Sequence, residues 1–103
     1  QVFDEWVCGG DHPTLFAVDR PVLVDMQAAL PGVGRRRMGG VPLWCRSSGL
    51  RLEPHMRGRQ IAWVRRFDGG FFAVVEVVAG SADGRSRLTM QLWVEPDMIS
   101  TTV

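Results

Sequence analysis

The stretch that most constrains the fold is residues 61–95, which have the pattern of three β-strands joined by two tight turns. Residues 61–67 are rich in aromatic and β-branched side chains and stop at the Asp-Gly-Gly sequence of 68–70. This is a strong hairpin signal, because glycine tolerates the positive φ of a tight turn. Residues 71–78 are apolar except for Glu76. Such a run is typical of a central strand that is covered on both faces.

The third segment of this stretch, residues 85–95, alternates between apolar and polar side chains after a turn at 81–84. Its apolar set is Leu88, Met90, Leu92 and Val94, and its opposite set is Arg87, Thr89, Gln91, Trp93 and Glu95. A period of two with one apolar side predicts a half-buried strand. Pro96 cannot donate a hydrogen bond to a ladder and is expected to end the strand.

Short extended segments are predicted outside the meander. They are residues 15–18, 41–46, 50–54 and 98–100, and residues 2–7 form either a strand or an ordering arm. Pro42 indicates that the 41–46 strand lies at an edge. Residues 55–60 are polar and basic, and they lead into the meander.

Residues 20–30 have the signals of a helix start, because Asp19 can act as the N-cap and Pro21 falls in the first turn. A competing interpretation makes residues 21–26 a strand. We favour the helix. The segment 31–40, rich in Gly and Arg, is expected to be a flexible loop.

These elements predict one domain, residues 1–103, of mainly β structure in the β or α+β class. Several short strands with closely spaced turns favour a small antiparallel barrel or a strongly bent sheet built on the 61–95 meander, with at most one short helix near 20–30. A barrel of the SH3-like kind is compatible with a meander that is followed by a proline and a final short strand. This is an analogy of architecture only.

The composition is that of a globular protein, with 46% hydrophobic residues. All twelve basic residues are Arg, and Lys, Asn and Tyr are absent, which suits the codon usage of a GC-rich, bacterial genome. No apolar run reaches the ~20 residues that span a bilayer, so no membrane partner is expected, and a cytoplasmic location is favoured. Residue 1 is Gln rather than Met, so we expect a fragment, a processed form or a trimmed chain.

Charge is distributed unevenly although the net charge is only +1. Residues 1–30 hold five acidic side chains and one Arg, whereas residues 31–60 hold seven Arg and one Glu. One interpretation is an anionic partner for the basic segment. The simpler interpretation, which we favour, is that the two segments lie against each other or are both solvated.

Residues that could carry chemistry are few. Weak candidates for a zinc site are Cys8, His12, Cys45 and His55. Their spacing lacks the short paired motifs of zinc sites, so no metal and no cofactor are expected. Cys8 and Cys45 form either a disulfide or two buried thiols, and we favour the thiols. No phosphate-binding glycine motif is present, and an enzyme is the least favoured class.

The candidate binding surface combines Trp and Arg side chains of the meander with the basic segment before it. Its residues are Trp63, Arg65, Arg87, Trp93, Arg35, Arg36, Arg37, Arg57 and Arg59. Such a surface can stack bases and contact phosphates, or it can bind an extended peptide. The alternative is that Trp63 and Trp93 are core residues, or are covered by a loop or the N-terminal arm.

Two functions follow from these features. The favoured hypothesis is a non-enzymatic protein-interaction or assembly module, including a self-associating β domain, with a protein partner or a homo-oligomer. The alternative is a small β domain that binds nucleic acid through the Arg and Trp surface and the basic 35–59 segment. A net charge of +1 gives little support to the alternative.

Overall fold

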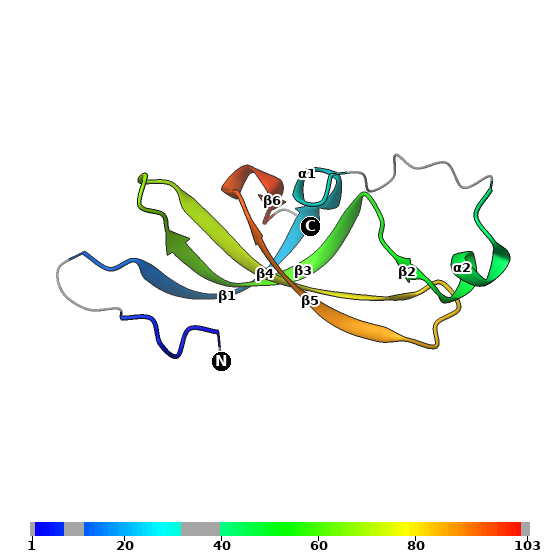
Figure 1. Ribbon diagram of the computed structural model, residues 1–103. Helices are drawn as coiled ribbons and strands as arrows, with labels where there is room; N and C mark the ends of the chain where they lie inside the picture. Colours follow the sequence, from blue (N-terminus) through cyan, green and yellow to red (C-terminus); the bar gives the residue numbers. More distant parts are fainter. Residues whose placement is uncertain (1, 8–11, 32–39, 102–103) are drawn as a thin grey trace.

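The computed structural model describes residues 2–7, 12–31 and 40–101. Its elements in chain order are β1 (Leu15–Asp25), α1 (Met26–Ala29), α2 (Leu43–Ser48), β2 (Leu50–Arg51), β3 (His55–Arg65), β4 (Phe71–Ser81), β5 (Arg87–Val94), the 3₁₀-helix η1 (Pro96–Met98) and β6 (Ile99–Ser100). Figure 1 shows long, twisted strands that cross near the middle of an elongated molecule. The molecule measures 55 × 24 × 24 Å.

The strands form one antiparallel sheet of the order β2-β4-β3-β1-β6, with β5 paired to β4. The mainly β prediction is confirmed. The barrel and the SH3-like arrangement are not, because the six-stranded sheet is not closed. After β5 the chain turns through η1, and β6 then pairs with β1 at Leu23 and Val24.

The 61–95 meander is confirmed as β3, β4 and β5, and β3 begins earlier than expected, at His55. The first turn contains Gly69 at a φ of 91°, and Asp68 Oδ1 accepts a hydrogen bond from the Gly70 N–H. The second turn contains Gly84 at a φ of 77°. Both glycines occupy the left-handed region that other residues avoid. Pro96 follows the end of β5, as predicted.

The 20–30 helix prediction is wrong for most of its length. Strand β1 runs through Pro21 to Asp25, as in the competing interpretation, and the helix α1 covers only Met26–Ala29. Asp25 acts as the N-cap, because its carboxylate accepts a hydrogen bond from the Ala28 N–H. The alternation at Val22 and Val24, both fully buried, fixes the strand, because a period of two suits a pleated surface.

The prediction of a strand at 41–46 is also wrong. The prediction of at most one short helix is wrong for the same reason, because this segment contains a second one. Residues Leu43–Ser48 form α2, with Pro42 at the N-cap. A proline fits there, because the first N–H groups of a helix have no intrahelical acceptor. The Pro42 carbonyl accepts hydrogen bonds from the Cys45 and Arg46 N–H groups. Residues 2–5 form a turn rather than a strand, and the loop predicted at 31–40 lies largely outside the described residues.

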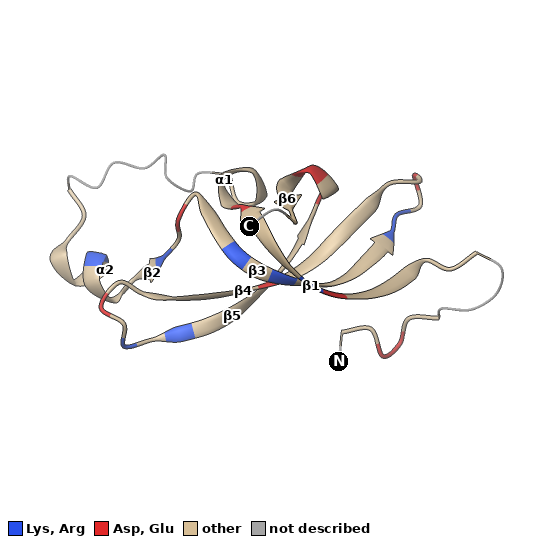
Figure 2. Ribbon diagram, turned by 180° about the vertical axis from the view of Figure 1, so that it is seen from behind, with Lys and Arg blue, Asp and Glu red and all other residues tan. Residues whose placement is uncertain are grey.

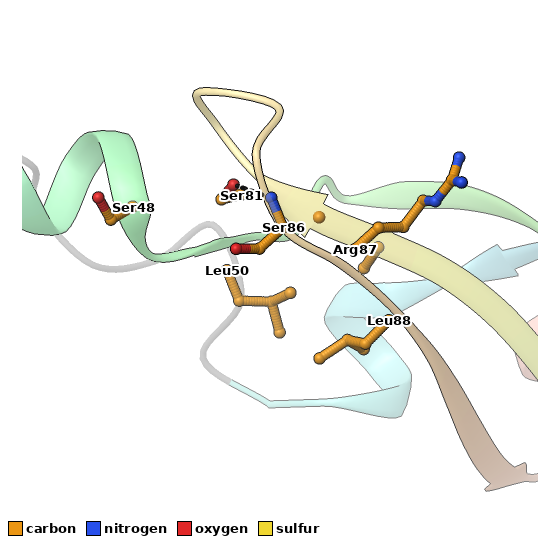
Figure 3. Close-up of a pocket in the computed structure, with 8 residues that line it drawn as sticks. Ser48, Leu50, Ser81, Ser86, Arg87 and Leu88 are labelled. Atoms are coloured by element: carbon orange, nitrogen blue, oxygen red, sulfur yellow. Dashed lines mark hydrogen bonds between the residues drawn. The ribbon is translucent and has the colours of Figure 1, made fainter.

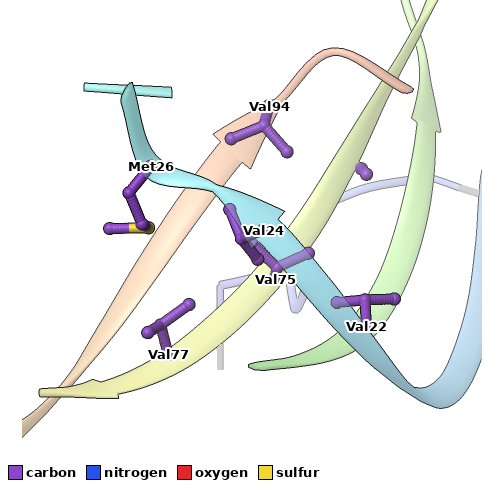
Figure 4. Packing of buried hydrophobic residues seen from close by; sticks show 7 residues of the cluster. Val22, Val24, Met26, Val75, Val77 and Val94 are labelled. Atoms are coloured by element: carbon purple, nitrogen blue, oxygen red, sulfur yellow. The ribbon is translucent and has the colours of Figure 1, made fainter. Parts of the chain in front are cut away.

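The core lies on one face of the sheet, under α1 and η1. It is built mostly from valines of β1 and β4 together with Met26 of α1: Val22, Val24, Met26, Ala73, Val75, Val77 and Val94. Figure 4 shows these side chains converging between the strands. Met26 is fully buried, because α1 folds back over the end of β1. The Met26 N–H donates a hydrogen bond to the Pro54 carbonyl.

Candidate functional site

The pairing of β3, β4 and β5 assigns every side chain to one of two faces, because residues paired across antiparallel strands point the same way. Trp63 pairs with Ala73, which pairs with Val94 of the core. We call this the core face. Ala62 pairs with Val74, which pairs with Trp93, on the opposite or outer face.

An extra residue in β3 changes which side chains share a face. The pairing with β4 shifts between Gln60 and Ala62, so Ile61 is a β-bulge. Arg59 pairs with Glu76 and belongs to the outer face, whereas Trp63 belongs to the core face. The expected combination of Trp63 with Trp93 on one surface is therefore not formed.

One end of the core face carries an apolar groove of about 420 Å³, lined by Phe16, Trp63, Phe71 and Pro96. We call it the aromatic groove. Two guanidinium groups lie against its rings. The Cζ atom of Arg20 is 5.7 Å from the Trp63 ring centre, and that of Arg65 is 4.7 Å from the Phe71 ring centre. Both distances are within the range of cation–π attraction.

Gln60 supports this groove from within the sheet. It is fully buried, its Oε1 accepts a hydrogen bond of 2.8 Å from Arg20 Nε, and its Nε2 donates to the Ala62 carbonyl at 3.1 Å. These two bonds satisfy the buried amide across the bulge. Sequence reasoning missed Phe16, Phe71 and Pro96 as neighbours of Trp63, because a bulge has no clear signal in a single sequence.

On the outer face, Trp93 is part of an aromatic cluster. Its ring centre lies 6.0 Å from that of Phe3 and 6.3 Å from that of Phe72. Phe3 belongs to the N-terminal segment, so that arm partly covers Trp93, as one of the two interpretations expected. The Trp93 side chain is still 41% exposed.

Arg57 and Arg59 of β3 and Arg87 of β5 also lie on the outer face, whereas the predicted Arg65 lies on the core face. Arg57 and Arg59 line a hollow of about 390 Å³ together with Gly58, Glu76, Val78 and Thr89. Figure 2 shows basic segments along β3 and β5, with acidic ones between and beside them. Arg59 forms an ion pair with Asp19, and Arg87 begins β5. Arg35, Arg36 and Arg37 lie outside the described residues.

The weak metal candidates are not brought into a cluster within the described part of the chain. His12 and His55 are exposed, Cys45 is a half-buried free thiol in α2, and Cys8 is not among the described residues. No group of three or more His, Cys, Asp or Glu side chains within 2–7, 12–31 and 40–101 could hold a metal ion.

The outer edge of β5 is the most open structural feature. Its eight residues, Arg87–Val94, pair with β4 along Ala73–Gly80. No strand among the described residues pairs with its other side. The strand has no proline and no bulge, and Arg87 is its single charged residue. Natural edge strands usually carry prolines, bulges or several charged side chains, because an unpaired edge can otherwise bind another chain.

The opposite edge, β1, is protected by comparison. Its register with β3 shifts between Ala17 and Arg20, Pro21 interrupts its donors, and β6 pairs with Leu23 and Val24. Each of these reduces the capacity of an edge to accept a further strand. The contrast makes β5 the candidate site for association.

A small cavity of about 180 Å³ lies at the start of β5, between that strand, β2 and the end of α2. Figure 3 shows Leu50 and Leu88 side by side at this place, with Ser48, Ser81, Ser86 and Arg87 around them. Leu50 and Leu88 are each 48% exposed. Apolar surface therefore continues beyond the covered core to the open edge.

Comparison with protein-family models, curated proteins and solved structures found no match to this chain. Neither α-helix that the structure describes is long and apolar enough to cross a membrane.

Proposed function

We propose that this chain is a non-enzymatic assembly module that associates with a further polypeptide along the outer edge of β5. The observation that carries the proposal is the eight-residue open edge, flanked by exposed apolar side chains. Main-chain hydrogen bonds to such an edge supply affinity, and alternate side chains supply specificity.

The shape of the molecule supports this proposal. The radius of gyration is 16.2 Å, whereas a compact domain of this length has about 13 Å. The accessible surface is 7438 Å², whereas a monomer of this mass exposes about 5,800 Å². An open sheet with this much surface leaves apolar side chains without cover, and association is the usual way to cover them.

A matched pair of leucine variants tests the proposal. Leu88→Lys places a charge on the open edge strand, whereas Leu43→Lys changes an exposed leucine of α2 that belongs neither to β5 nor to the lining of the cavity beside it. Association is measured in two ways: by the molar mass of the purified chain in light scattering, and by binding of peptides selected from a random display library. We expect wild type and Leu43→Lys to associate and Leu88→Lys to lose association.

The proposal is overturned if the wild-type chain is a strict monomer and selects no peptide. It is also overturned if Leu43→Lys and Leu88→Lys reduce association equally.

A second candidate function is nucleic-acid binding through the outer-face hollow, where Arg57 and Arg59 lie two residues apart on β3. Glu76 and the Asp19 ion pair reduce the positive potential there. Fluorescence anisotropy with single- and double-stranded DNA and RNA at ~50 mM salt is the test, because phosphate contacts are strong in that regime. Binding that Arg57→Ala weakens would support this function, and the absence of binding would exclude it.

A further inference from the structure

We infer that the polypeptide on the β5 edge is a second copy of this chain, paired antiparallel with β5 about a two-fold axis at Gln91. The inference rests on the proposed function and names its partner. It follows from the order of side chains along Arg87–Glu95, which is complementary to itself when reversed.

The faces of the sheet limit the allowed registers. Residues that pair across two strands point to the same face of the sheet. If the core faces of the two copies are to lie on the same side, even-numbered residues of β5 must pair with even-numbered ones, and odd-numbered residues with odd-numbered ones. In the register centred on Gln91, Leu88 lies opposite Val94 and Met90 opposite Leu92. All four side chains belong to the core face, because Val94, Leu92, Met90 and Leu88 alternate along one strand.

Charge complementarity supports this register. Arg87 of each copy lies opposite Glu95 of the other, so the two-fold axis produces two ion pairs at the ends of the paired segment. Glu95 is 53% exposed, and its present cation, Arg66, is 3.8 Å away. That surface contact is weak and leaves the carboxylate able to accept a second partner.

The neighbouring registers are less complementary. Centring on Met90 puts Val94 opposite the polar Ser86 and puts Glu95 opposite Arg85, a residue of the turn between β4 and β5. Centring on Leu92 puts Leu88 opposite Pro96, which cannot donate to the ladder. Only the Gln91 register pairs Leu88–Val94 entirely with itself and places Arg87, the arginine of β5, opposite Glu95 at both ends.

The same register explains the exposed leucine at the start of β5. Leu88 is 48% exposed in the single chain, and the Leu88–Val94 pairing would cover it with the second copy. The six-stranded sheets of the two copies would then form one continuous sheet. Both aromatic grooves would lie on the same side of that sheet, one toward each end.

Cysteine cross-linking tests the register directly, in a background in which Cys8 and Cys45 are serine. With an axis at Gln91, the two copies of Gln91→Cys lie directly opposite, within disulfide reach. Thr89→Cys is the matched control on the same strand and face. Its two copies are offset by four positions, roughly 13 Å along the strand. We expect Gln91→Cys to form the covalent dimer and Thr89→Cys to form none.

Charge reversal tests the ion pairs without new thiols. Arg87→Glu places like charges opposite each other at both ends, so we expect the dimer Kd to rise roughly tenfold. Arg87→Glu with Glu95→Arg reverses both partners and is expected to restore most of the affinity. Circular dichroism of each variant checks that the fold is retained.

Two results overturn the inference and leave the proposed function standing. One is a dimer that cross-links through Thr89→Cys as efficiently as through Gln91→Cys, or a dimer whose Kd is unchanged by both charge-reversal variants. The other is a monomeric chain that still binds library peptides in a way that Leu88→Lys abolishes. A monomer that binds no peptide overturns both.

Discussion

Trp63 and Trp93 lie on opposite faces of the sheet, because Trp63 pairs with Ala73 and Trp93 pairs with the next residue of β4, Val74. Trp63 packs against the hydrophobic core and lines the aromatic groove. Trp93 contacts Phe3 and remains partly exposed on the outer face. The two indoles therefore contribute differently to stability.

Replacing each tryptophan with alanine measures that difference. Trp63→Ala removes core packing and two aromatic or cationic contacts, so we expect a loss of about 2–3 kcal/mol in the free energy of unfolding. Trp93→Ala removes a more exposed ring, and we expect a loss of about 1 kcal/mol. Denaturant unfolding followed by circular dichroism gives both values. Equal losses would contradict the assignment of faces.

The buried amide of Gln60 is expected to be coupled to Arg20. Gln60→Met keeps much of the volume but removes the acceptor for Arg20 Nε, and we expect a loss of about 1–3 kcal/mol. Arg20→Met leaves the Gln60 Oε1 without this donor. The double variant should cost less than the sum of the two single variants, by about 1 kcal/mol. Strict additivity in urea unfolding would show that the bond does not contribute.

Gly58 is expected to be intolerant of any side chain. A Cβ atom at this position would lie 2.7 Å from the Glu76 carbonyl oxygen, which is backbone and cannot move aside cheaply. We expect Gly58→Ala to destabilise the fold by about 1–3 kcal/mol. Gly40→Ala is the control, because nothing lies within 4 Å of its added Cβ, and it should change stability by less than about 0.5 kcal/mol. Thermal unfolding compares the two variants, and equal midpoints would refute the tight β3–β4 approach.

The turn between β4 and β5 is expected to weaken in acid. The Ser81 hydroxyl and the Arg85 N–H donate to Asp83 Oδ1, and these hydrogen bonds hold the pKa of Asp83 below its ordinary value of 3.8. A carboxyl whose pKa is lowered by folding stabilises the fold above its unfolded pKa, and the stabilisation is lost as pH falls through the lowered value.

Asp83→Ala measures this contribution. The difference in thermal midpoint between wild type and Asp83→Ala should be constant above about pH 5 and should shrink below pH 3.8. A difference that does not change from pH 7 to pH 2.5 would mean that the carboxylate does not support the turn.

The meander was predictable because its signals are local. Two glycine-containing turns bound the apolar run that became β4, and the alternation of Met90, Leu92 and Val94 marks the core side of β5. The helix at Leu43–Ser48 was missed because its apolar residues suggested a strand. Trp44 is 72% exposed, so burial of the apolar side chains does not determine the conformation of this segment. The helix instead begins after the proline at its N-cap.

The candidate sites were only partly predictable because they depend on pairing between distant segments. The bulge at Ile61 reverses the face of every later residue in β3, which separates Trp63 from Arg59. The open edge of β5 results from the position of β6 on β1, on the far side of the sheet. Neither fact can be derived from the periodicity of one segment, although the self-complementary order of Arg87–Glu95 is present in the sequence.

The most direct measurement is an isotope-filtered NOE experiment on a mixed sample of labelled and unlabelled chains, which detects only contacts between copies. We expect intermolecular NOEs between the Met90 and Leu92 methyl groups and between those of Leu88 and Val94, which are adjacent in the Gln91 register. An absence of intermolecular NOEs at β5, or NOEs from β1 in their place, would contradict assembly along this edge.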